Sequence, residues 1–394
     1  SCTACYLSKE ANQTPALPFS EVKTQLDKIR AHLGPWGNTQ LTAGEVTLMP
    51  ADDLVRITKY CHDIQLSAMV MTHGDTFRED PTYLERLVTE GNLEKVAIHV
   101  DTTQRGRAGL KGKEKNLKEK DLHPIRDEFA KLVKETRKKT GKTLHAAHTY
   151  TVDPSNLDGV PDVMDWVLEN SDAYRMISFQ PTAEVGRTRT GRMTESRELV
   201  WSKIEQGCGK AINHQPYLFG HPDCNDVTLF FVVKFAGERH LVEVTRPDEP
   251  VDAAFLQRLL HCGFTGFSPD GQPAMEQLAK VIGRVIKDPS GLAAVIGYCG
   301  YRSWTEKSWL PRLLATIARG EEWQVNPFVI VVHHFMSADM LDTPVGKARL
   351  EACTFRLPVG DEMVPMCRMN GTDLRLKTNQ ETQERLGNAA PVAA

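Results

Sequence analysis

Residues 68–101, AMVMTHGDTFREDPTYLERLVTEGNLEKVAIHVD, decide the fold class because they hold a strand, a helix and a second strand in succession. The apolar runs at 68–72 and 95–100 have the length of strands, whereas residues 81–91 read as a helix. Strands that are apolar on both faces are typical of parallel sheets covered by helices. The stretch therefore predicts a βα unit.

The same alternation extends over the first half of the chain. Further strands are predicted at 38–42 (NTQLT), 143–150 (TLHAAHTY) and 174–181 (YRMISFQP). Five strands then precede residue 185, and one more before Ser1 would make six. We therefore expect an α/β fold in which residues 1–185 form a partial (β/α)6 TIM-like barrel without its first strand.

From about residue 186 onward this rhythm is lost. Strands are predicted at 228–235 (TLFFVVKF), 239–244 (RHLVEV) and 326–335 (NPFVIVVHHF), with helices among them. We expect a C-terminal α+β domain over 186–380 that serves as an auxiliary or substrate domain. The polar residues 381–394 are predicted to be a disordered tail.

The composition is that of an ordinary soluble globular protein. Of the 394 residues, 41% are hydrophobic and 25% charged, and the formal net charge of -3 gives no reason to expect a nucleic-acid partner. The longest apolar runs are too short to cross a membrane, so no transmembrane segment is predicted. Nine cysteines without disulfide spacing favour thiols or metal ligands in a reducing, cytoplasmic setting.

Two short motifs carry the chemistry. Cys2 and Cys5 form a Cys-x-x-Cys pair, a spacing that also serves zinc ribbons and redox sites. Ala43, Gly44 and Glu45 follow a predicted strand directly, at the end where α/β barrels keep their active sites. There, glycine permits close backbone approach to a ligand, and glutamate offers a carboxylate to an ammonium group.

Together these residues resemble the radical S-adenosylmethionine (radical SAM) enzymes. The resemblance implies that Cys2 and Cys5 are the second and third ligands of a [4Fe–4S] cluster, with the first cysteine three positions before Ser1. It implies that Glu45 contacts the amino group of SAM. The family usually has Gly-Gly-Glu where this chain has Ala43-Gly44-Glu45, and an aromatic residue where this chain has Ala4.

Residues 333–370, HHFMSADMLDTPVGKARLEACTFRLPVGDEMVPMCRMN, resemble the C-terminal stretch of a narrower group of Fe–S oxidoreductases. That group includes archaeal pterin methylases and tetraether lipid synthases, and its members tend to carry additional clusters. The resemblance implies a small-molecule or lipid substrate, and a one-electron reductant such as flavodoxin or ferredoxin. It implies hydrogen abstraction from an unactivated C–H bond by a 5′-deoxyadenosyl radical, followed by methylation or C–C bond formation.

Four cysteines stand in loop-like contexts that suit cluster ligation. They are Cys208, Cys224, Cys353 and Cys367. They form a candidate second [4Fe–4S] site, because the backbone of such loops can donate N–H groups to sulfur. Scattered free thiols are the alternative. Cys61 and Cys262 follow apolar helical patterns and are predicted to be core residues.

Polar residues at other strand ends are candidates for holding SAM or substrate. Asp101 would suit ribose hydroxyls, and Gln180 follows the last strand of the barrel. Further candidates are Thr72, His73, Thr102 and His148. Each is also explicable as a cap of a strand or helix.

Two other function classes remain open. A non-catalytic zinc or rubredoxin-like protein would use the Cys-x-x-Cys pair without SAM. A hydrolytic or lyase barrel would need acid–base or metal-ligand histidines, for which His73 and His148 are available. No His-x-His or Glu-x-x-His spacing supports the second class.

Overall fold

The computed structural model describes most of the chain. The described residues are 4–42, 44–104, 107, 117–188, 196–215, 219–246, 249–261 and 289–387. Cys2, Ala43 and Cys262 lie outside them, so the predictions for these three residues are not placed.

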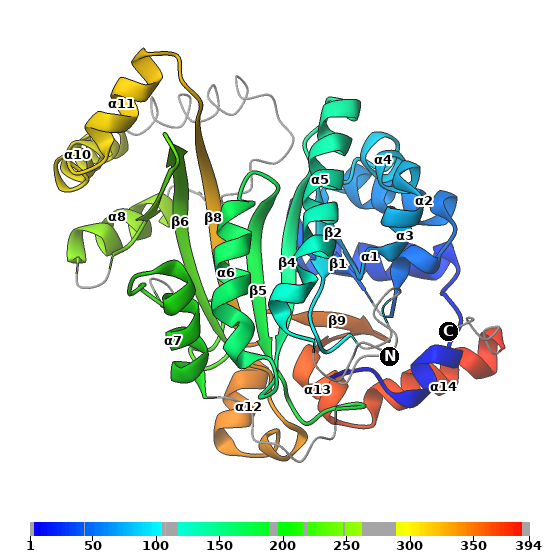
Figure 1. The fold of residues 1–394 in the computed structure, drawn as a ribbon. Coiled ribbons are helices and arrows are strands. Elements are labelled where there is room, and N and C mark those ends of the chain that lie inside the picture. The colour runs from blue at the N-terminus through cyan, green and yellow to red at the C-terminus, as the bar shows by residue number, and fades with distance from the viewer. Residues whose placement is uncertain are drawn as a thin grey trace.

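Five parallel strands form the first part of the sheet, as predicted. They are β1 (Gly37–Leu41), β2 (Leu66–Thr72), β3 (Lys95–His99), β4 (His145–Val152) and β5 (Tyr174–Pro181). Each pairs in parallel with the next. Their carboxyl ends therefore meet at one edge of the sheet, which lies toward the bottom of Figure 1.

The second half of the chain extends this sheet. β8 (Trp323–His333) runs parallel to β5, β6 (Asn225–Phe235) runs antiparallel to β8, and β7 (Glu238–Glu243) runs antiparallel to β6. The described order is β1-β2-β3-β4-β5-β8-β6-β7. The α/β class with a TIM-like strand order is confirmed, and the sheet continues across the boundary expected at residue 185.

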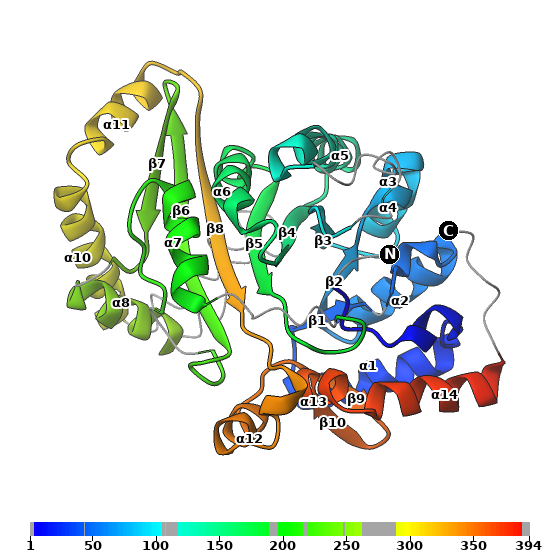
Figure 2. The ribbon, with the colours of Figure 1, turned by 60° about the horizontal axis from the view of Figure 1, so that its bottom comes forward.

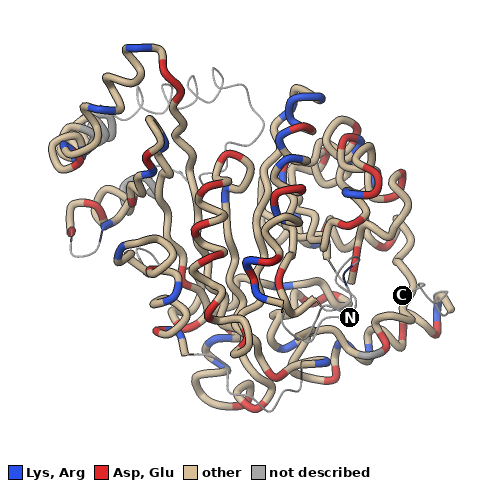
Figure 3. The backbone as a smooth tube through the Cα atoms, viewed as in Figure 1, with Lys and Arg blue, Asp and Glu red and all other residues tan. Residues whose placement is uncertain are grey.

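One face of the sheet packs against helices. These are α2 (Ala51–Asp63), α3 (Asp75–Glu79), α4 (Pro81–Thr89), α5 (His123–Thr140), α6 (Val160–Glu169) and α7 (Arg197–Cys208). Phe129, Tyr150 and Trp201 are fully buried in the resulting core. Cys61 is fully buried beside Ile57 and Leu66, which confirms its predicted core role. The exposed side of α5 carries charges of both signs (Figure 3).

Further helices cover the β6–β7 end of the sheet. They are α8 (Pro250–His261), α10 (Pro289–Thr305) and α11 (Leu310–Ala318), at the left of Figure 2. Leu256 of α8 packs on Val227 of β6, and Leu313 of α11 packs on Phe235. Short 3-10 helices are η1 (Lys9–Gln13), η2 (Val46–Leu48), η3 (Glu119–Leu122), η4 (Leu157–Gly159) and η5 (Ala338–Met340).

The C-terminal segment returns to the carboxyl end of the sheet. It contains α12 (Pro344–Glu351), the antiparallel pair β9 (Arg356–Val359) and β10 (Glu362–Pro365), α13 (Met366–Gly371) and α14 (Leu374–Leu386). It lies near α1 (Phe19–Leu33), below the main sheet in Figure 2.

The prediction of disorder from residue 381 is wrong for its first six residues, since α14 is helical to Leu386. The amides of Asn379 and Gln383 bond to Ser8 and Glu10 of the N-terminal segment, and Arg385 pairs with Glu21. Pairing with the N-terminal segment holds a helix whose own composition is polar.

Candidate functional site

The loop that carries Cys5 lies against the segment that follows β5. The Cys5 N–H donates to Thr188 Oγ1 at 2.7 Å, and the Cys5 carbonyl accepts from the N–H groups of Arg187 at 2.9 Å and Thr188 at 3.2 Å. Gly186 makes this approach possible, because a Cβ there would lie 2.2 Å from the Tyr6 carbonyl oxygen, and its φ is +57°. The residue at this position must therefore be glycine.

The same loop also reaches the end of β1. The Tyr6 hydroxyl lies 3.2 Å from Thr42 Oγ1, one residue after β1 ends. Gly44 follows with a φ of +92°, and a Cβ there would meet open space. Cys5 and the Gly44-Glu45 pair thus lie at the carboxyl edge of the sheet, where the sequence predicts them. Arg375 of α14 adds a positive charge, with its guanidinium 5.4 Å from the centre of the Tyr6 ring.

The Glu45 carboxylate is held by the end of β2. Oε1 accepts from the Thr72 hydroxyl at 2.5 Å and from the Thr47 hydroxyl at 2.6 Å, and Oε2 accepts from the His73 N–H at 2.8 Å. The side chain keeps 12% exposure, with His73 Nε2 at 3.3 Å. Thr72 and His73 therefore donate hydrogen bonds to Glu45 and fix the orientation of its carboxylate before any ligand binds.

Asp101 is buried and fully bonded within the chain. Oδ1 accepts from the Thr103 N–H at 2.9 Å and its hydroxyl at 2.5 Å, and Oδ2 accepts from the Thr151 N–H at 2.7 Å and lies 2.5 Å from His99 Nε2. Burial alone raises the pKa of Asp101, but His99 and these donors lower the pKa below its usual range. The expected ribose contact is not favoured here, because an Asp two residues before Thr103 forms a local turn instead.

His99 is the residue in this region that the sequence reasoning missed. It ends β3, it is 24% exposed, and the buried Asp101 carboxylate fixes one of its ring nitrogens. A His-x-Asp spacing at the end of a predicted strand was the available signal. Of these two residues, His99 is the one able to contact a ligand.

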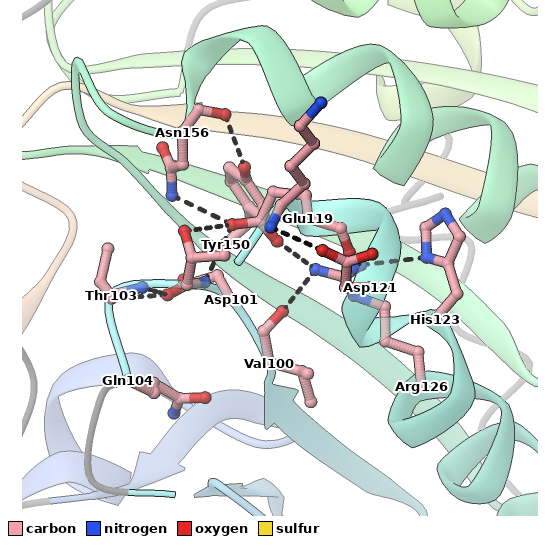
Figure 4. A network of polar contacts seen from close by, with 12 residues as sticks. Val100, Asp101, Thr103, Gln104, Glu119, Asp121, His123, Arg126, Tyr150 and Asn156 are labelled. Atoms are coloured by element: carbon pink, nitrogen blue, oxygen red, sulfur yellow. Dashed lines mark hydrogen bonds and ion pairs between the residues drawn. The ribbon is translucent and has the colours of Figure 1, made fainter. Parts of the chain in front are cut away.

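A buried ion pair supports the loop after β3. Arg126 donates to Glu119 Oε2 at 2.5 Å, to the Glu119 carbonyl at 2.7 Å and to the Val100 carbonyl at 2.9 Å (Figure 4). Glu119 in turn accepts from the Thr102 N–H at 2.9 Å and from its hydroxyl at 2.7 Å. Thr102 therefore has a structural partner, and the loop that holds Asp101 is fixed from the helix side.

The remaining strand-end candidates differ in access. Gln180 is partly exposed, with its amide 3.5 Å from Ser178 Oγ. His148 is fully buried between Tyr150, Trp166 and Tyr174 on the helix face. Burial lowers the pKa of His148 well below the usual value, and it cannot act together with His73 on a substrate.

Three of the four predicted loop cysteines come together. Gly220 lies in the loop before Cys224. A Cβ on Gly220 would lie 3.0 Å from the carbonyl oxygen of Ala352, the residue before Cys353. The Met366 N–H, next to Cys367, donates to the Phe355 carbonyl at 2.8 Å. Burial, with smaller contributions from Cys353 and Cys224, raises the pKa of Cys367 to about 11. Burial and, to a lesser extent, Cys224 also raise the pKa of Cys353. We call Cys224, Cys353 and Cys367 the cysteine trio.

N–H groups already point at this sulfur set. Arg349 Nε donates to Cys224 Sγ at 3.3 Å, and the Met336 N–H donates to Cys367 Sγ at 3.5 Å. Such bonds accompany iron–sulfur ligation. Ser337, next to Met336, accepts from the Glu184 N–H at 3.0 Å, and Glu184 lies two residues before Gly186. The cysteine trio and the Cys5 loop are therefore neighbours through one hydrogen-bonded segment.

Cys208 is not part of this set, so the four-cysteine prediction is wrong. α7 begins at Arg197, whose Nε donates to Asp226, two residues after Cys224, at 2.7 Å. Cys208 lies 11 residues further along this helix (208 − 197), which places it about 16 Å away along the helix axis. Gly207-Cys208-Gly209 looks like a flexible loop in the sequence. In the structure it is a helix end, with Gly209 as the left-handed C-cap at φ 71°.

A cavity of about 2360 Å³ connects these features. It touches Tyr6, Gly44, Glu45 and Cys353 at one end and continues along the sheet face opposite the helices. Six methionines are among the residues of its apolar wall. They are Met49, Met69, Met176, Met363, Met366 and Met369. The volume exceeds that of an ordinary small-molecule site, so an additional substrate fits beside a cofactor.

Metal-ligand clusters and membrane-spanning helices were sought in the described ranges. Within them, no three His, Cys, Asp or Glu side chains come close enough to hold a single metal ion. No helix within them has the length and apolar character needed to cross a bilayer.

Comparison with known proteins finds distant likenesses to solved structures. No family model matches the chain, and no curated protein sequence matches it. A xylose isomerase-like TIM-barrel protein from Mycobacterium smegmatis, solved in complex with magnesium, is 15% identical over 66% of this chain and 88% of its own, with a TM-score of 0.32. A family 18 glycoside hydrolase, an N-acetylglucosaminidase from Paenibacillus barengoltzii, is 12% identical over 56% and 71%, with a TM-score of 0.29.

Proposed function

We propose that the protein is a radical SAM iron–sulfur enzyme. The observation that carries this proposal is the position of Cys5. The glycine-dependent contact with Gly186 holds its loop against the end of β5, and Tyr6 ties it to the end of β1, next to Gly44 and Glu45. A cysteine loop at the carboxyl edge of a parallel sheet, beside a Gly-Glu turn, is the arrangement that the proposed chemistry needs.

The residues of this chain have separate tasks. Cys2 and Cys5 would hold a [4Fe–4S] cluster which, with SAM bound, supplies the one-electron cleavage that yields a 5′-deoxyadenosyl radical. Glu45, held by Thr72 and His73, would accept hydrogen bonds from the ammonium group of SAM. The positive φ of Gly44 leaves its backbone open to a ligand. The C-terminal segment would exclude water from the cavity.

We propose further that the cysteine trio holds an additional iron–sulfur cluster. Burial raises the pKa of Cys353 and of Cys367, so thiolates there would need the positive charge of a metal centre. N–H donors from Arg349 and Met336 already point at two of the sulfurs. A substrate that undergoes methylation or C–C bond formation would occupy the cavity, and an external reductant such as flavodoxin or ferredoxin would supply the electron.

The test is SAM cleavage by the full-length protein, reconstituted anaerobically with iron and sulfide and then reduced with dithionite. We expect release of 5′-deoxyadenosine, which Cys5→Ser abolishes and Cys61→Ser leaves intact. Cys61 is the matched control because it is a thiol buried in the core, away from the sheet edge.

Metal analysis of the same samples separates the alternatives. Zinc in place of iron, with no deoxyadenosine at any SAM concentration, would contradict the proposal and favour a structural metal protein. Equal iron in wild type and Cys5→Ser would also contradict the assignment of Cys5 as a ligand.

A further inference from the structure

A second polar site lies at the amino ends of the strands, opposite the cysteine loop. Lys95 begins β3, His145 begins β4 and Arg175 is the second residue of β5. Lys95 and His145 are paired in the β3–β4 register, and Arg175 falls at the irregularity between β4 and β5. All three side chains line the cavity that also touches Gly44 and Glu45. Three nitrogen-bearing side chains thus converge on one end of this cavity.

Arg175 is the unusual member of this group. Its Nε and Nη1 atoms are closed off from solvent and have no hydrogen-bond partner in the described part of the chain. Asp172 acts on its charge, but the Asp172 carboxylate lies 3.4 Å from Lys134 Nζ. Buried donors are normally paired, and an unpaired buried charge opposes folding. A ligand oxygen that accepts hydrogen bonds from Arg175 would explain why a guanidinium is present at this position.

Lys95 and His145 lie beside Arg175. Lys95 Nζ donates to Ser67 Oγ at 2.6 Å and to Asn38 Oδ1 at 3.0 Å. His145 Nδ1 has no hydrogen-bond partner within the described ranges. Burial, with the charges of Arg175, Arg137 and Lys95, lowers the pKa of His145 to about 3. His145 is therefore neutral near pH 7, and Arg175 and Lys95 are the cations that line the cavity beside it.

The cavity sets the shape of the ligand. Asn38 accepts from Lys95, Thr42 contacts Tyr6, and both line the cavity; from Asn38 to Thr42 the chain rises about 13 Å at 3.3 Å per residue. Between the two ends the cavity wall is apolar, with Met69, Met176 and Val331 facing it. Methionine side chains adapt to an irregular apolar body. The ligand is therefore elongated, with its charge at one end.

We propose that Lys95, His145 and Arg175 bind the carboxylate or phosphate end of an elongated, mainly apolar ligand, whose other end reaches the cysteine loop. Arg175 offers the fork of donors that suits either anion, and Lys95 adds a point charge. This site does not depend on the cluster, so its test is independent of SAM cleavage.

The experiment is calorimetric titration of the purified protein with decanoate, decyl phosphate and decan-1-ol, each below its aggregation limit. We expect at least one anion to bind roughly tenfold more tightly than the alcohol of the same chain length. A preference for decanoate or for decyl phosphate identifies which anion the site takes. Equal binding of all three compounds, or binding of none, would overturn the proposal.

Variants locate the effect. Arg175→Met should abolish the preference for the anion and leave binding of decan-1-ol unchanged, whereas Arg137→Met should keep it, because Arg137 is close but does not line the cavity. Since Arg175 lacks a structural partner, Arg175→Met should melt at the same temperature as wild type or higher. Equal loss in the two variants, or a markedly lower melting temperature for Arg175→Met, would overturn the assignment. Lys95→Met, which should weaken anion binding several-fold, provides a second variant if Arg175→Met does not fold.

Discussion

Replacing Arg126 by methionine should destabilise the protein strongly through the loop after β3. The guanidinium is fully buried and bonds to the Glu119 carboxylate and to two backbone carbonyls. Methionine fills a similar volume without donating, which leaves Glu119 Oε2 and the two carbonyl oxygens without the donor that Arg126 provides. Breaking a buried ion pair in this way costs about 3–5 kcal/mol of the free energy of unfolding.

The cost should also depend on pH. Burial raises the pKa of Glu119, and Arg126 opposes this rise, so the pKa increases further once the guanidinium is gone. The folded variant then holds a proton that the unfolded chain releases above the ordinary glutamate pKa. Stability of the variant is therefore highest below that value and falls as pH rises, by about 1.4 kcal/mol per unit.

The assay is urea unfolding followed by circular dichroism between pH 5 and 8. Arg126→Met is compared with Glu119→Gln and with the double variant, in which an amide replaces the unpaired carboxylate. We expect the double variant to recover stability relative to Arg126→Met, most clearly at pH 8. A loss below about 1 kcal/mol for Arg126→Met, or no recovery in the double variant, would refute the reasoning.

Three further predictions concern other parts of the site. Gly186→Ala should release bound iron, because a Cβ would lie 2.2 Å from the Tyr6 carbonyl oxygen. The control is Gly141→Ala, where φ is +66° and a Cβ would meet open space; this variant should keep its iron and lose about 1 kcal/mol of the free energy of unfolding. Cys353→Ser should lower the iron content by about half if two similar clusters are present, whereas Cys208→Ser should not change it; equal iron in both variants would contradict the cysteine trio. Burial and the neighbouring His334 lower the pKa of His333 to about 4, so the folded chain resists a proton that the unfolded chain takes up below pH 6.5. The free energy of unfolding should therefore fall as pH drops from 6.5 toward 4. In thermal unfolding curves, His333→Gln should reduce the slope of stability against pH by up to about 1.4 kcal/mol per pH unit. An unchanged slope would contradict the assignment.

The sequence predicted the elements whose signal is local. Alternating apolar strands and helical faces located β1 to β5, because the apolar strand residues pack against the apolar faces of the helices. Gly44 was interpreted as permitting close backbone approach to a ligand, and the structure adds that its φ of +92° is a conformation that favours glycine.

Features that depend on distant partners were not predictable in the same way. α14 has a polar composition, and its contacts with η1 come from the other end of the chain. Cys208 has the same glycine-rich neighbours as a cluster loop, but Gly209 ends a helix. The unpaired Arg175 becomes evident only when the strand register places it beside His145 and Lys95.

The central claim is that SAM binds directly to a cluster held by the Cys5 loop. The most direct measurement is the electron paramagnetic resonance spectrum of the reconstituted, reduced full-length protein, recorded with and without SAM. We predict a [4Fe–4S]+ signal that changes when SAM is added, and a change that is absent in Cys5→Ser but retained in Cys353→Ser. A cluster signal in wild type that SAM leaves unaltered would contradict the account.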